Sequence, residues 1–122
     1  MNHERHGGAC MTITGLQNGD VKLLVAGGYR FDSFTTTEIY SMQESKWNDG
    51  PNLPRGFYFG SYIQYPYGQD FVMVGGKDDS GVIFDNFMRY NPNSEQFELL
   101  PANLKSARWA SGATLAVIKD DC

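Results

Sequence analysis

The amino-acid sequence predicts an all-β fold made of repeated four-stranded antiparallel units. Fourteen glycines together with eight Phe, seven Tyr and two Trp among 122 residues are typical of many short strands joined by turns around an aromatic core. No segment places apolar residues at helical spacing over three turns. Several landmarks also recur with a period near 50 residues, which predicts a repeat architecture.

The period is set by separate landmarks that agree with one another. The segment 24–28 (LVAGG) recurs as 72–76 (VMVGG), 48 residues later. Six residues separate Tyr40 from Trp47, and six separate Tyr90 from Phe97. Glycines followed by a small residue also recur every 52 positions, at Gly8, Gly60 and Gly112.

Each unit divides into four predicted strands. Those of the first unit are 8–14, 21–26, 35–40 and a segment around Trp47. Those of the second are 60–65, 71–74, 86–90 and a segment around Phe97, and a strand at 111–118 opens a third unit. Asn18 and Gly19 form a hairpin turn signal. The predicted repeat boundaries are therefore 1–54, 55–107 and 108–122.

This pattern resembles the kelch repeat, in which paired glycines after an apolar strand are followed by a Tyr, then a Trp, then an Arg before the next blade. The matching residues are Gly27, Gly28, Tyr40, Trp47 and Arg55, then Gly75, Gly76, Tyr90, Phe97 and Arg108. Phe97 replaces the Trp, and Met88 stands where the first unit has the family's Glu at position 38. The resemblance implies a partial kelch β-propeller of two four-stranded antiparallel blades plus the first strand of a third.

The resemblance also implies structural roles for these landmarks. Paired glycines permit close backbone packing and positive φ, and the aromatic residues fill the wedge between adjacent blades. The residues assigned to architecture are Gly27, Gly28, Tyr40, Trp47, Gly75, Gly76, Tyr90 and Phe97. Because a complete propeller has about 4–8 blades, two units leave apolar blade faces uncovered. We therefore expect a fragment of a larger propeller, or a subunit that completes its ring by self-assembly.

Known site chemistries find little support in the sequence. His3 and His6 with Cys10 lack a fourth zinc ligand, and we expect Cys10 to be a small buried hydrophobe. The pairs 78–79 and 120–121, each two aspartates, do not lie in a calcium-loop pattern. No catalytic Ser elbow and no phosphate-binding loop occur. The sequence predicts a non-catalytic protein with no metal and no cofactor.

Charge and hydropathy point away from nucleic acids and membranes. The net charge is −4 with both signs mixed along the chain, which gives no electrostatic attraction to nucleic acid or an anionic membrane. No apolar stretch is long enough to cross a bilayer. The first residues lack the apolar segment of a signal peptide, which favours a cytoplasmic location.

The remaining candidate site is a protein-binding surface. In the kelch-like substrate adaptors that this chain resembles, partners dock on the loops that precede the first strand of a blade and follow the double glycine. The positions this implies are Tyr29, Arg30, Phe31, Arg55, Tyr58, Arg108 and Trp109. Aromatic and Arg side chains are enriched in binding hot spots, and Arg binds carboxylates with paired hydrogen bonds, so an acidic peptide is the expected ligand. The alternative is that Arg55 and Arg108 stabilise the loops and that Phe57 or Tyr58 belongs to the core.

Two functions follow from these observations. The first is a non-catalytic protein–protein interaction module, for example the substrate-recognition part of a ubiquitin-ligase adaptor or a scaffold. The alternative is a piece of a kelch-propeller enzyme, or of a secreted carbohydrate-binding or oxidase protein, whose active site lies in other blades.

Overall fold

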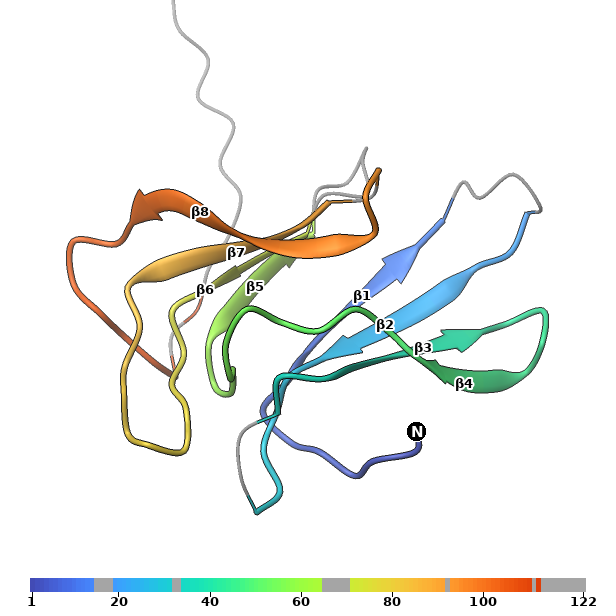
Figure 1. Cartoon of the computed structure of the whole chain (residues 1–122), viewed down its shortest axis with the longest axis horizontal. Helices are drawn as coiled ribbons and strands as arrows, with labels where there is room; N and C mark the ends of the chain where they lie inside the picture. The colour runs from blue at the N-terminus through green and yellow to red at the C-terminus, as the bar shows by residue number, and fades with distance from the viewer. Residues whose placement is uncertain (15–18, 32–33, 65–70, 92, 111, 113–122) are drawn as a thin grey trace, which may run out of the picture.

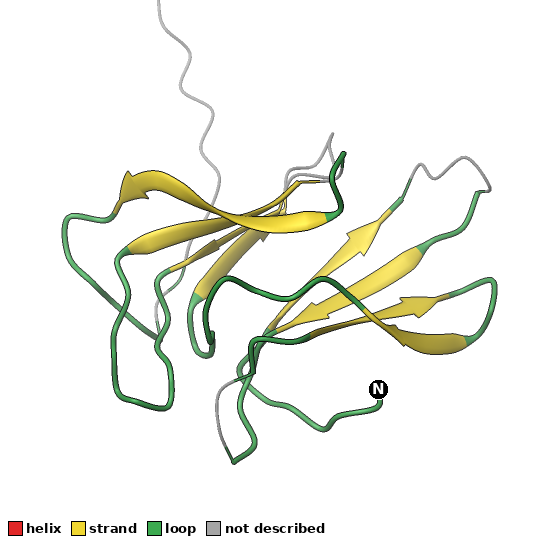
Figure 2. Ribbon diagram, viewed as in Figure 1, coloured by secondary structure: helices red, strands yellow, loops and turns green. Residues whose placement is uncertain are grey.

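Two four-stranded antiparallel sheets make up the described part of the molecule (Figures 1 and 2). This computed structural model describes residues 1–14, 19–31, 34–64, 71–91, 93–110 and 112, and these residues contain no helix. In that same part of the chain no helix is present that could cross a membrane. The predicted all-β fold of two propeller blades is confirmed.

The strands follow one another in space in sequence order. The first blade consists of β1 (Ala9–Ile13), β2 (Lys22–Ala26), β3 (Thr37–Ser41) and β4 (Lys46–Asp49). The second consists of β5 (Ser61–Gln64), β6 (Phe71–Val74), β7 (Asn86–Asn91) and β8 (Gln96–Asn103). Residues 113–118 of the strand expected in a third unit lie outside the described residues, and the proposed repeat boundaries stay a prediction.

Matching registers relate the two blades residue by residue. Leu23 pairs with Tyr40 and Tyr40 with Trp47 in the first blade, as Phe71 pairs with Tyr90 and Tyr90 with Phe97 in the second. The ring centroids of Tyr40 and Trp47 lie 5.2 Å apart, and those of Tyr90 and Phe97 lie 5.3 Å apart. The spacing that suggested a repeat therefore places the same aromatic pair across the two outer strands of each blade.

The hydrophobic core lies where one face of the first blade meets the opposite face of the second, with β1 and β5 adjacent (Figure 1). Alternate residues of β1 and β2 face this core, because side chains of a strand alternate between the two faces of a sheet. Phe57, in the connection between the blades, is completely buried. The buried core residues are Ala9, Met11, Ile13, Leu24, Ala26, Leu53, Phe57, Phe71, Met73, Met88, Tyr90 and Phe97.

The first glycine of each pair has a backbone conformation and an environment that exclude a side chain. Gly27 and Gly75 both have a φ of 65°, a left-handed conformation that favours glycine. A Cβ at Gly27 would lie 2.5 Å from the carbonyl oxygen of Phe57, and one at Gly75 would lie 2.5 Å from that of Arg108. The glycines therefore let each blade approach the chain segment that leads out of it.

Gly27→Ala is expected to destabilise the protein by more than the cost of the left-handed conformation alone. Gly81 is a matched control, because its φ is also positive at 83° but nothing lies within 4 Å of an added Cβ. Gly81→Ala should cost about 1–2 kcal/mol, the penalty for a Cβ in that conformation, and Gly27→Ala clearly more. Urea unfolding of both variants measures the difference, and equal losses would show that the contact with Phe57 is unimportant.

Cys10 is exposed, and the expectation that it is buried was wrong. Ala9, Met11 and Ile13 alternate as the buried residues of β1, so Cys10 points to the face of the strand away from the hydrophobic core. The sequence did not reveal which of the two alternating sets meets a neighbouring blade. The Cys10 sulfur lies 3.8 Å from the hydroxyl of Tyr62 on β5.

Candidate functional site

A row of aromatic rings runs across the loops at one end of both blades. We call His6, Tyr29, Tyr58, Phe59 and Trp109 the aromatic surface. Ring centroids lie 5.5 Å apart for His6 and Tyr29 and 5.0 Å apart for Tyr29 and Tyr58. The row continues at 5.4 Å from Tyr58 to Phe59 and at 6.4 Å from Phe59 to Trp109. Rings at these separations interact favourably with one another. Tyr58 is buried at 9% exposure, whereas Phe59 and Trp109 are 41% and 43% exposed.

Backbone hydrogen bonds hold these loops in position. The amide of Gly28 donates to the carbonyl of Phe57 at 2.6 Å, and the amide of Gly76 donates to that of Arg108 at 2.9 Å. The amide of Phe59 donates to the carbonyl of Gly7 at 2.8 Å. Each double glycine is thus tied to the loop that follows its blade, and side chains on these loops are held on rigid backbone.

The backbone at Phe59 is strained. Its φ is 52°, which is unusual for a bulky residue, and 41% of the side chain remains exposed. Gly7 and Ala110, at the corresponding places in the neighbouring loops, have φ values of 67° and 51°. A large apolar side chain that is kept exposed in such a conformation is typical of a functional surface.

Cations lie against the aromatic surface. The Lys77 ammonium is 3.8 Å from the ring centroid of Trp109 and 5.3 Å from that of Tyr58, and such cation–π contacts are attractive. Arg30 stacks on Phe31 at 5.2 Å and pairs with Glu4 at 3.2 Å. Phe31 is 81% exposed, so the loop after the first double glycine presents an aromatic ring and a guanidinium to solvent.

A family model described as Kelch motif matches residues 20–54, which run from the turn before β2 into the loop after β4. The first blade is therefore a kelch motif. The matched segment contains Gly27, Gly28, Tyr40 and Trp47, and β5–β8 reproduce the strand order and registers of the first kelch blade. No curated protein matches the chain.

Arg55 lies inside the second blade, apart from the aromatic surface. Its guanidinium donates to the carbonyl of Gly75 at 2.9 Å and to the side-chain oxygen of Asn86 at 2.9 Å, and it stacks on Phe84 at 3.7 Å. Burial lowers the pKa of Arg55 to about 10, although the negative charges of Asp78 and Asp85 partly oppose this shift. The guanidinium is therefore still a cation at neutral pH. These contacts support the reading in which Arg55 stabilises the loop.

Arg5 makes the corresponding side-chain contacts in the first kelch blade, and it was not predicted from the sequence. Its guanidinium donates to the carbonyls of Gly27 at 2.8 Å and Thr36 at 2.9 Å and pairs with Glu38 at 2.9 Å. It also stacks on Phe34 at 4.7 Å. The available signal was the interval of 50 residues between Arg5 and Arg55, which is the repeat period.

The structure brings together most of the predicted binding residues. Tyr29, Tyr58 and Trp109 join the aromatic surface, and Arg30 and Phe31 lie in the same loop as Tyr29. Phe57 belongs to the core, and Tyr58 is also buried, as the alternative expected. Arg108 is exposed, and its Nε donates to the carbonyl of Ser106 at 3.4 Å. His6 and Phe59 were not predicted from the sequence, although His6 and Tyr58 are one repeat period apart. Lys77 lies in the loop that was expected to be the counterpart of 29–31 in the second unit.

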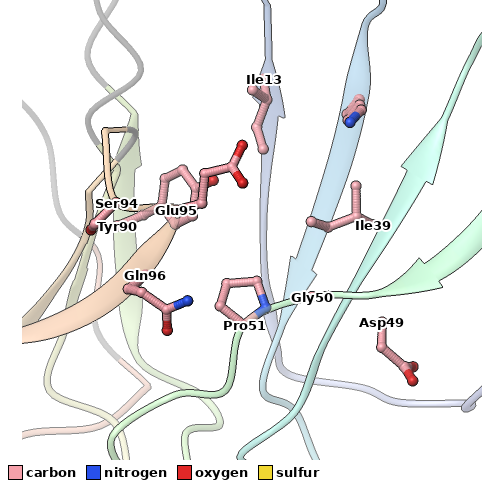
Figure 3. Close-up of a pocket in the computed structure, with 10 residues that line it drawn as sticks. Ile13, Ile39, Asp49, Gly50, Pro51, Tyr90, Ser94, Glu95 and Gln96 are labelled. Atoms are coloured by element: carbon pink, nitrogen blue, oxygen red, sulfur yellow. The ribbon is translucent and has the colours of Figure 1, made fainter.

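A cleft of about 290 Å³ opens between the two blades (Figure 3). Ile13, Ile39 and Tyr90 line its apolar part, and charged groups of both signs from Lys22 and Glu95 also line it. Burial raises the pKa of Tyr90, and the nearby Glu95 adds to this effect. Among the described residues, no group of three or more His, Cys, Asp or Glu side chains is placed to hold a metal ion.

Proposed function

We propose that this protein binds a partner protein through the aromatic surface and the adjacent loop 29–31. The observation that carries the proposal is the continuous row of rings from His6 to Trp109, with the Phe59 ring exposed from a strained backbone. Kelch repeats generally mediate protein–protein interactions, and kelch domains are typically non-catalytic. Exposed aromatic side chains on a rigid backbone contribute large contact area at a small cost in side-chain entropy.

The partner segment in this proposal is acidic. Lys77 lies against Trp109, and Arg30 and Arg108 extend from the loops at either side. A carboxylate between a cation and an aromatic edge would gain charge-assisted hydrogen bonds while its aliphatic part packs on the rings. We propose substrate recognition in a ubiquitin-ligase adaptor, or a scaffold, as the cellular setting of this interaction.

Trp109→Ala is expected to weaken binding of a fluorescein-labelled peptide rich in Asp and Glu by at least about tenfold, the effect of removing one hot-spot side chain. Phe31→Ala should weaken it in the same direction. Leu99→Ala removes a side chain that is equally exposed but lies on β8, and serves as the matched control. Fluorescence anisotropy measures the affinities, and circular dichroism confirms that each variant is folded.

Two results would contradict this proposal. One is equal affinity of the protein for acidic peptides and for neutral peptides of the same length. The other is an unchanged affinity in both Trp109→Ala and Phe31→Ala.

We also propose that the protein self-assembles to extend its propeller. The described residues form two blades, whereas a closed propeller has about 4–8. Blade faces of the kind buried between the two blades are present at both outer sides.

A further inference from the structure

Each blade has one face that no described residue of another blade covers. The first open face is the side of the first blade that carries Leu23, Val25, Tyr40 and Trp47, which alternate with the core residues of their strands. The second open face is the side of the second blade that carries Ile63, Val72 and Phe87. Both faces are apolar at their centres.

The first open face is more exposed than the equivalent face of the second blade, which the first blade covers. Leu23 is 38% exposed, whereas Phe71, its equivalent in the second blade, is 0% exposed. Tyr40 and Trp47 are half-buried, whereas their equivalents Tyr90 and Phe97 are buried. The difference arises because the first blade packs on Phe71, Tyr90 and Phe97. A blade in the corresponding position would bury Leu23, Tyr40 and Trp47 in the same way.

The second open face shows the complementary difference. Met11 and Leu24 are buried on the first blade, whereas their register equivalents Ile63 and Val72 on the second blade are half-buried. The side chain at Leu24 is covered by the second blade, and Val72 has no such cover among the described residues. Arg89 and Glu98, paired at 3.8 Å, form a polar outer edge of this face.

The two open faces are therefore the two halves of the interface that already holds the blades of this chain together. We propose that copies of the chain associate head to tail, with the first open face of one copy packed on the second open face of the next. This inference rests on the proposed self-assembly and specifies its polarity, and it does not depend on the aromatic surface. Such a contact is heterologous, so it joins two different surfaces and leaves one of each unpaired in a dimer.

Arg108 is the polar anchor of this contact. The amide of Phe59 donates to the carbonyl of Gly7, and the amide of Ala110 donates to the carbonyl of Phe59. Gly7, Phe59 and Ala110 are therefore equivalent positions in three successive loops. Two residues earlier in each loop lie Arg5, Phe57 and Arg108.

Arg108 thus occupies the position from which Arg5 contacts the carbonyl of Gly27 and the carboxylate of Glu38. In the proposed contact, Arg108 of one copy takes the place of Arg5 beside Glu38 of the next copy. Residues 2–5 of that second copy, which cover Glu38, leave it. One buried Arg–Glu pair replaces another, so the exchange requires no unpaired buried charge.

The test uses two variants that each block one face. Leu23→Asp places a carboxylate on the first open face, and Val72→Asp places one on the second. Sedimentation velocity should show concentration-dependent association of the unaltered chain and monomers for each variant alone. An equimolar mixture should form a dimer and nothing larger, because the Val72→Asp copy keeps an intact first face and the Leu23→Asp copy an intact second face. Val82→Asp, at an exposed position on neither face, should associate normally.

Two outcomes would overturn the inference. A chain that remains monomeric at every concentration would show that a second copy does not cover these faces. Association of either variant by itself would show that like faces meet, because each variant keeps one face intact. Thermal melts of the variants check that each is folded. Phe31→Ala should leave association unchanged while it weakens peptide binding, which separates failure of this contact from failure of the aromatic surface.

Discussion

Glu38→Ala is expected to destabilise the first blade by about 3–5 kcal/mol, the usual cost of removing one partner from a buried ion pair. Glu38 and Arg5 are 1% and 2% exposed and lie 2.9 Å apart. The same carboxylate accepts hydrogen bonds from the amides of Asn2 and His3. Its loss leaves a buried guanidinium and releases the N-terminal segment, and urea unfolding followed by circular dichroism measures the effect.

The chain contains its own control for this prediction. Arg30 and Glu4 form an ion pair at 3.2 Å, but both side chains are at least half exposed, so Glu4→Ala should cost no more than about 1 kcal/mol.

A second comparison uses the other blade, where Met88 is fully buried at the position equivalent to Glu38. The double variant Arg5→Met with Glu38→Met should recover much of the stability that Glu38→Met loses, because an apolar pair leaves no buried charge. Equal losses for Glu38→Ala and Glu4→Ala would contradict the structural role assigned to Glu38.

Phe57→Ala is expected to cost about 3–5 kcal/mol, the range for deleting a buried aromatic side chain. Phe57 is 0% exposed and lies in the segment that joins the two blades. Its ring would meet a Cβ built on Gly60 or Gly76, and its carbonyl oxygen one built on Gly27, so a cavity there loosens contacts to both blades at once. Chemical denaturation gives the free energy of unfolding.

Phe31→Ala is the matched control, because it removes the same type of side chain from a position that is 81% exposed. It should change the free energy of unfolding by less than about 0.5 kcal/mol. If Phe57→Ala were as mild as Phe31→Ala, the ring of Phe57 would not connect the blades in the way its burial indicates.

The strands and aromatic pairs could be predicted from the sequence because they depend on local patterns that repeat. The interval from Tyr40 to Trp47 spans one tight turn, so it places the two rings on paired positions whatever surrounds them. The position of Cys10 depended instead on which face of β1 meets a neighbour, and alternation alone does not decide this. The sequence also did not show whether the Arg55 side chain faces solvent or stabilises the loop. Its hydrogen-bond partners Gly75 and Asn86 are distant in sequence.

The candidate site was harder to predict because its members come from separate loops. Tyr29 and Tyr58 become neighbours only when the double glycine of one blade bonds to the loop that enters the next. The left-handed backbone of Phe59 carries no sequence signature, since this conformation is usually found at glycine, as at Gly7.

His6, Tyr58 and Trp109 occupy one position in three successive loops, although the three residues differ. The loops are held by main-chain hydrogen bonds from Gly28 and Gly76, and these bonds do not depend on the side chain at that position. The residues proposed for recognition and the contacts that hold the loops are therefore separate. The specificity of such a surface can change by substitution in its loops while the strands that support it stay as they are.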